Sequence, residues 1–119
     1  MDYLGLDVFN TGPQVDWGAP FWRSFGQAFA EPYKALTAIS TKPILLPEVG
    51  STEVGGSKAQ WISDLLTTEL VQFPRVRALI WFDVSKEQPW SLHSSAATLN
   101  AWTAGSSQPM FAGGPTIAN

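Results

Sequence analysis

The chain has 119 residues and lacks cysteine, a basic cluster and a long apolar run. Without cysteine it has no disulfide, no thiolate nucleophile and no zinc site built on sulfur. Its seven Lys and Arg residues are scattered and its net charge is −3, which argues against nucleic-acid binding. No stretch approaches the roughly 20 apolar residues of a membrane-spanning helix. His93 is the only histidine, so we expect no metal site, and no cofactor is predicted.

Apolar and aromatic residues are what the sequence has in abundance. Hydrophobic residues make up 45% of the chain, charged residues make up only 14%, and there are six Trp and seven Phe. This composition and length predict one compact domain with a buried core. Aromatic side chains fill cores, but they also form flat platforms on which sugar rings stack.

Three apolar, β-prone runs recur along the chain, at residues 3–10, 43–50 and 75–83. They begin 40 and 33 residues apart and alternate with helical patterns, which is typical of successive β/α units around a parallel sheet. Eight such units form a barrel of about 250 residues. Alternation alone does not separate a barrel from an open sheet. No Gly-x-Gly-x-x-Gly follows the first run, so no dinucleotide site is predicted.

The segments between these runs have helical spacing. Residues 21–40 carry apolar positions three and four apart, but Pro32 should break a continuous helix. We therefore predict a short helix that ends near Ala30 and a second one with Pro32 in its first turn. A helix capped by Ser57 should run to about Val71, and a last helix should cover 95–102.

We expect residues 1–103 to form one unit and residues 104–119, rich in Gly, Ser and Pro, to form a flexible tail. The amino-terminal segment MDYLGLDVFN is apolar and strand-like, and it has no basic region or cleavage site of a signal peptide. A strand so close to the first residue suggests that further strands belong upstream.

Glu48 is the most conspicuous polar residue, because it follows the apolar run Ile44-Leu45-Leu46 at the end of the second predicted strand. Active sites of β/α barrels lie at the carboxyl ends of strands. A carboxylate there is costly to desolvate unless it is paired, hydrogen-bonded or used. Catalysis is one interpretation, and an ion pair or a loop cap is the other. Trp90, in the loop after the third strand, is a candidate sugar platform.

Three segments resemble glycoside hydrolase family 26, the family of β-mannanases and related endo-β-glycanases. The first is Leu4-Gly5-Leu6-Asp7-Val8-Phe9-Asn10, which is similar to the sixth strand of the family's barrel. The second is Lys42-Pro43-Ile44-Leu45-Leu46-Pro47-Glu48-Val49-Gly50-Ser51-Thr52-Glu53 with Gly55-Gly56-Ser57-Lys58 and Trp61-Ile62. The third is Phe73-Pro74-Arg75-Val76-Arg77-Ala78-Leu79-Ile80-Trp81-Phe82-Asp83. The resemblance implies a partial (β/α)8 TIM barrel, namely its last three β/α units, strands 6 to 8.

The resemblance also implies roles for single residues. Glu48 matches the family's catalytic nucleophile, and Trp81 matches the aromatic residue that floors the site. Asn10 lies where the family lines its cleft. Phe9 stands where the family usually has Tyr, so the hydroxyl that would hydrogen-bond the nucleophile is missing here.

Retaining glycosidases use two carboxyl groups about 5–5.5 Å apart. The family's acid/base residue belongs to strand four, which this chain does not contain. The resemblance therefore implies a fragment of an endo-acting retaining glycoside hydrolase that acts on mannan or a related β-glycan and needs the missing amino-terminal strands. One alternative is a non-catalytic remnant or a carbohydrate-binding fragment that uses Trp81 and Trp90. Another is an unrelated α/β domain. The family usually acts outside the cell, but this sequence contains no export signal. The sequence therefore leaves the localisation open.

Overall fold

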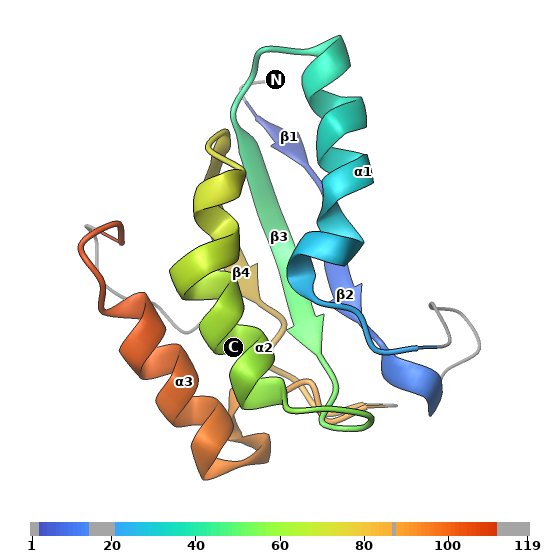
Figure 1. Ribbon diagram of the computed structural model, residues 1–119, viewed down its shortest axis with the longest axis vertical. Coiled ribbons are helices and arrows are strands. Elements are labelled where there is room, and N and C mark those ends of the chain that lie inside the picture. Colours follow the sequence, from blue (N-terminus) through green and yellow to red (C-terminus); the bar gives the residue numbers. More distant parts are fainter. Residues whose placement is uncertain (1–2, 15–20, 87, 112–119) are drawn as a thin grey trace.

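The computed structural model describes residues 3–14, 21–86 and 88–111. The chain alternates short strands with helices, shown along the sequence in Figure 1. The elements are β1 (Leu4–Gly5), β2 (Val8–Asn10), a 3-10 turn (Gly12–Gln14), α1 (Phe25–Ile39), β3 (Ile44–Ser51), α2 (Lys58–Asp64), a π-helical turn (Leu65–Glu69), a 3-10 turn (Leu70–Gln72), β4 (Val76–Trp81), a 3-10 turn (Leu92–Ser94) and α3 (Ala96–Ser106).

The strands form a small parallel sheet centred on β3. Along one edge, β1 pairs with the start of β3 and β2 pairs with its end, so the two are pieces of the predicted first strand. Along the other edge, β4 pairs in parallel with β3. The three predicted strands and the α/β class with a parallel sheet are thus confirmed. A closed barrel is not present in this segment.

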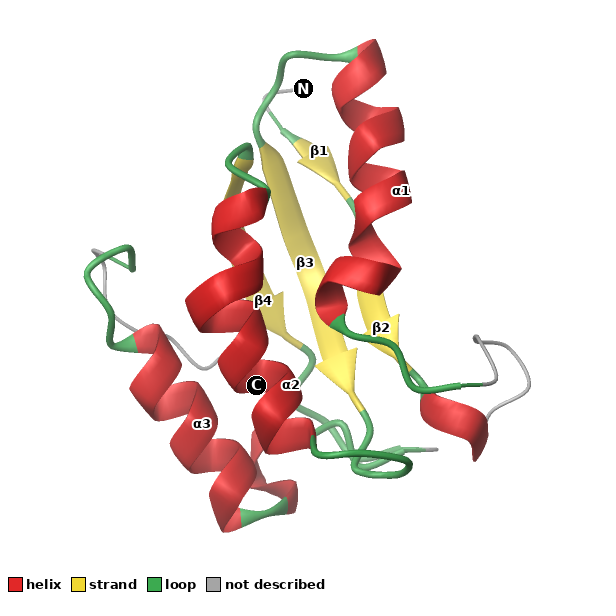
Figure 2. Cartoon of the chain, in the orientation of Figure 1, coloured by secondary structure: helices red, strands yellow, loops and turns green. Residues whose placement is uncertain are grey.

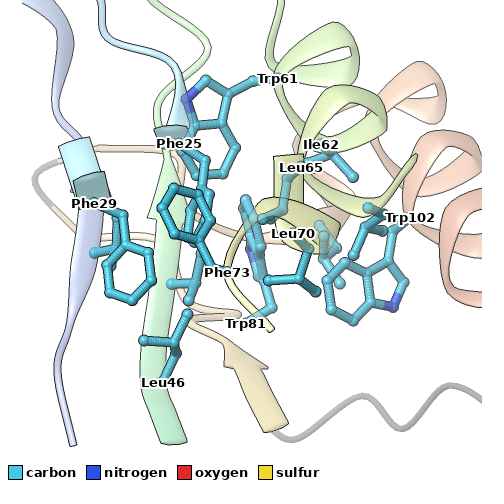
Figure 3. Close-up of a cluster of buried hydrophobic side chains, with 14 of the residues drawn as sticks. Phe25, Phe29, Leu46, Trp61, Ile62, Leu65, Leu70, Phe73, Trp81 and Trp102 are labelled. Carbon is cyan, nitrogen blue, oxygen red and sulfur yellow. The ribbon is translucent and has the colours of Figure 1, made fainter. Parts of the chain in front are cut away.

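The helices lie on one side of the sheet, with α1 and α2 in front of the strands and α3 beside α2 (Figure 2). The core fills the space between these two layers. Its aromatic centre is formed by Phe25, Phe29, Trp61 and Phe73, which pack edge-to-face or tilted against one another (Figure 3). No described helix covers the opposite side of the sheet, where Ile80 is 40% exposed. We call this side the open face.

Helix α1 is continuous, so the prediction of two helices broken near Pro32 is wrong. Ser24 caps its start in a reciprocal capping box with Gln27. Pro32 removes one backbone donor, yet Phe25 and Phe29 before it are fully buried and Tyr33 after it packs against the same core. Burial along this one face outweighs the lost hydrogen bond.

The other helices follow the predictions more closely. Ser57 accepts a hydrogen bond from the Gln60 amide, and the helical path continues from α2 through the two turns to residue 72, close to the predicted end. Helix α3 continues to Ser106, past the predicted boundary at 103. Gly105 lies inside this helix and does not end it. A Cβ at this position would lie 2.8 Å from the Cβ of Leu66, so glycine permits the close packing of α3 against Leu66. Residues 112–119 of the predicted tail lie outside the described residues.

Within the described ranges, no helix combines the length and the apolarity that crossing a membrane requires.

Candidate active site at the carboxyl end of β3

Glu48 lies at an irregularity near the end of β3. Leu46 and Val49 are both buried against the helices, and the pairing with β4 shifts register between them. Because neighbouring side chains of a strand point to opposite faces, Glu48 next to Val49 points to the open face. Glu48 is half-buried, and no hydrogen bond or salt bridge joins its carboxylate to another described residue. The interpretation of Glu48 as part of an ion pair or a loop cap is therefore not realised among the described residues.

Three aromatic rings pack against one another near Gly50, two residues after Glu48, and form what we call the aromatic wall: Phe9, Phe82 and Trp90. The Phe9 ring meets Phe82 at 5.5 Å and Trp90 at 5.2 Å between centroids, both edge-to-face. Phe9 pairs with Gly50, whose Cβ would lie 2.8 Å from the Phe9 ring. Glycine at this position therefore lets the ring lie across the strand.

Trp81 does not lie on the open face, which corrects the expectation that it floors a cleft. It is only 4% exposed, and its ring packs 5.9 Å from Trp61 and 5.8 Å from Trp102, on the helix side (Figure 3). The reason is register, because Trp81 pairs with Val49, which also points to the helices. Its neighbour Phe82 takes the open-face position instead. No signal in the sequence decides this choice, because it depends on the register of β4 against β3.

Asn10 and Trp90 are also placed differently from the prediction, because both are fully buried. The Asn10 Nδ2 donates to Ser51 Oγ at 3.0 Å and its Oδ1 accepts from the Arg23 amide at 2.9 Å, so Asn10 joins β2, β3 and the start of α1. Trp90 belongs to the aromatic wall but presents no exposed ring face on which a sugar would stack. Glu48 and Phe9 thus both lie toward the open face, where Phe9 pairs with Gly50 and the Trp90 ring packs against Phe9.

A buried lysine organises the loop that carries Trp90. Lys58, at the start of α2, is 0% exposed. Its Nζ donates to the carbonyl oxygens of Pro89, Trp90 and Ser91 at 2.6, 3.0 and 2.7 Å, and to Ser94 Oγ at 2.9 Å. Burial lowers the pKa of Lys58 to about 8, although nearby carboxylates oppose the shift.

These carboxylates, Glu53 and Asp83, are both held by neighbouring groups. Glu53 Oε2 accepts from Ser94 Oγ at 2.6 Å and from Thr98 Oγ1 at 3.1 Å. Burial raises the pKa of Glu53, but its hydroxyl donors and Lys58 outweigh this effect and leave that pKa below its usual value. Asp83 Oδ1 accepts from Ser91 Oγ at 2.9 Å and from the Leu92 amide at 2.7 Å. Their hydrogen bonds make both carboxylates anchors of the loop after β4.

The remaining candidate features of the described residues are a metal site, a groove on the helix side and His93. Among the residues that the structure describes, no three His, Cys, Asp or Glu side chains cluster in a way that would hold a metal ion. A groove on the helix side runs between the starts of α1 and α2, but Ser24 and Ser57 in its lining are already used as helix caps. His93 is exposed beside the loop after β4.

Comparison with known proteins finds two similar proteins that are named as glucan-cleaving enzymes. No family model matches the chain. Over 113 residues, covering 92% of this chain, it is 39% identical to Endoglucanase H of Acetivibrio thermocellus, and it spans only 12% of that protein. A GH128 endo-beta-1,3-glucanase from Sorangium cellulosum has a similar fold, with a TM-score of 0.53 and 20% identity over 85% of this chain and 40% of that one. These likenesses support a glycoside-hydrolase-like segment, and they do not single out family 26 or mannan.

Proposed function

We propose that this chain is the carboxyl-terminal part of a (β/α)8-barrel glycoside hydrolase, and that Glu48 is the nucleophile of a retaining reaction. The observation that carries the proposal is the Glu48 carboxylate itself. It lies in the carboxyl-terminal half of the central parallel strand, on the face that no described helix covers, and no described residue pairs with it. Chemistry in β/α barrels takes place at this end of the strands.

In the proposed reaction, Glu48 attacks the anomeric carbon of a β-linked sugar and the glycosidic bond to the leaving oxygen breaks. A second carboxyl group, from a strand outside this chain, protonates that oxygen. It then accepts a proton from the water that releases the sugar from Glu48. Phe9 offers no hydroxyl to orient the nucleophile, so the aromatic wall contributes shape and exclusion of water.

The incomplete sheet supports the barrel. Three parallel strands do not close on themselves, and Ile80 on the open face remains 40% exposed. In a complete barrel this face would be the packed interior, and the chain spans 40% of the glucanase structure that it matches. The amino-terminal strands of such a barrel are therefore the proposed partner of the open face.

The proposed substrate is a β-glycan polysaccharide, cleaved within the chain. The resemblance to family 26 favours mannan, while the names of the two similar proteins refer to glucan. Both sugars therefore belong in the test. The alternative of a carbohydrate-binding fragment that uses Trp81 and Trp90 has no observation in its favour, because both rings are buried.

The test is covalent trapping. The purified chain is incubated with 2-deoxy-2-fluoro β-mannobiosyl and β-cellobiosyl donors that carry a dinitrophenolate leaving group, and the adduct is located by mass spectrometry. This leaving group departs without protonation, so the acid/base residue is not needed. We expect a label on Glu48 that is absent from Glu48→Gln. Glu31→Gln, which changes an exposed carboxylate of α1, is the matched control and should label normally.

Each result has a defined meaning. A label on Glu53 or Asp83 instead would show that Glu48 is not the nucleophile. A folded chain that takes no label from either donor would overturn the proposal that these three β/α units assemble a glycosyl-accepting site.

A further inference from the structure

The most unusual group outside the proposed site is the fully buried ammonium of Lys58. It is surrounded by three backbone carbonyl oxygens of one loop, from Pro89, Trp90 and Ser91. Carbonyl oxygens accept hydrogen bonds but never donate them, so three that converge on one point require a group with several donors. A lysine ammonium has three protons and fits this demand.

Two of the three carbonyls have a second donor. The Trp90 oxygen also accepts from Trp81 Nε1 at 2.7 Å, and the Ser91 oxygen also accepts from the Ser94 amide at 3.1 Å. For the Pro89 oxygen, Lys58 at 2.6 Å is the only donor among the described contacts. Without Lys58 the Pro89 carbonyl, next to Trp90, would lack a hydrogen-bond donor. The cost of this unsatisfied group would favour a rearrangement of the loop.

The position of this loop matters at the proposed site. The Trp90 ring contacts Phe9 at 5.2 Å, and it would lie 3.4 Å from a Cβ at Gly50, two residues after Glu48. Glu53 and Asp83, the charged groups that face Lys58, bind Ser94 and Ser91 of the same loop. A chain of direct contacts therefore leads from Lys58 through Trp90 to the aromatic wall beside Glu48.

We propose that Lys58 is a positioning residue, whose ammonium gathers the carbonyls of residues 89–91 and thereby holds Trp90 against Phe9 beside Glu48. For its catalytic consequence the inference rests on the proposed function. Its structural consequence does not, so the two are measured separately.

The experiment uses the whole chain labelled with 5-fluorotryptophan, with each fluorine resonance assigned by its own Trp→Phe variant. Lys58→Met keeps an unbranched side chain that is one atom shorter, and it removes the donors. We expect the Trp90 resonance to shift and broaden, while that of Trp102, a core residue with no hydrogen bond to this loop, keeps its position. The rate of labelling at Glu48 should fall by about tenfold or more. Lys34→Met, on the exposed side of α1, is the matched control and should change neither.

Ser94→Ala is the second variant, in case Lys58→Met does not fold. It removes one contact of Lys58 and should move the Trp90 resonance in the same direction by a smaller amount. An unchanged Trp90 resonance in a folded Lys58→Met or Ser94→Ala protein would overturn the positioning role. A shifted resonance with unchanged labelling would disprove the link to Glu48. If the unmodified chain is not labelled at all, the proposed function fails, and the Trp90 resonance still decides the role of Lys58 in the loop.

Discussion

Replacing Lys58 with Met should change how the stability of the protein depends on pH. In the folded protein, burial lowers the pKa of Lys58 from 10.5 to about 8. Between these two values the unfolded chain binds more protons at this position than the folded protein does. The free energy of unfolding must therefore rise with pH across that interval because of Lys58. A Met at this position does not titrate, so Lys58→Met lacks this rise.

The size of the effect follows from the two pKa values. Each unit of difference corresponds to about 1.4 kcal/mol, and at pH 9.5 the folded protein has lost most of the Lys58 proton while the unfolded chain retains it. The free energy of unfolding of the parent chain minus that of Lys58→Met should therefore be about 2 kcal/mol larger at pH 9.5 than at pH 7. All other titrating groups are shared by the two proteins and cancel in this comparison.

The assay is urea unfolding of both proteins at the two pH values, with Lys34→Met as a control whose difference from the parent should stay constant. The difference in free energy of unfolding between the two proteins at pH 7 alone is not diagnostic. Loss of the Lys58 hydrogen bonds lowers the free energy of unfolding, whereas removal of the buried charge raises it. A difference that stays constant or shrinks as the pH rises would refute the reasoning, because it would mean that Lys58 is not held as a charged group at a cost.

Three substitutions and one control at an exposed position test the packing by urea unfolding. Phe29→Ala should lower the free energy of unfolding by about 3–5 kcal/mol, because the ring is fully buried among other aromatic rings. Ile39→Ala, at a 79% exposed position, is the control and should change it by less than about 0.5 kcal/mol. Gly105→Ala should destabilise by about 1 kcal/mol, since the clash with Leu66 exceeds the gain in helix propensity; a more stable variant would show that this contact is loose. Pro32→Ala should stabilise by about 2 kcal/mol by restoring a helical donor, and a loss of stability would contradict this account of α1.

The candidate site was only partly predictable. Glu48 was identifiable because a carboxylate directly after an apolar run stands out in the sequence itself. Trp81 and Phe82 are adjacent aromatic residues, and a short apolar run does not reveal which of them faces the helices. That choice depends on the register of β4 against Val49, a contact between distant segments. Lys58 belongs to a segment of the family resemblance, but no role is predicted for it, because nothing local in the sequence distinguishes a buried lysine from an exposed one.

What the sequence by itself determined is the order of strands and helices, the helix starts at Ser57 and Ser95, and the place of Glu48 in the second predicted strand, which the structure extends to Ser51. These depend on apolar periodicity and on capping residues, which act over one or two turns. Only the tertiary structure decided the continuity of α1 through Pro32 and the burial of Trp81 and Trp90. These features depend on energies gained when separate segments pack together, and such long-range contacts override local preferences because burial of whole aromatic side chains outweighs the loss of a single hydrogen bond.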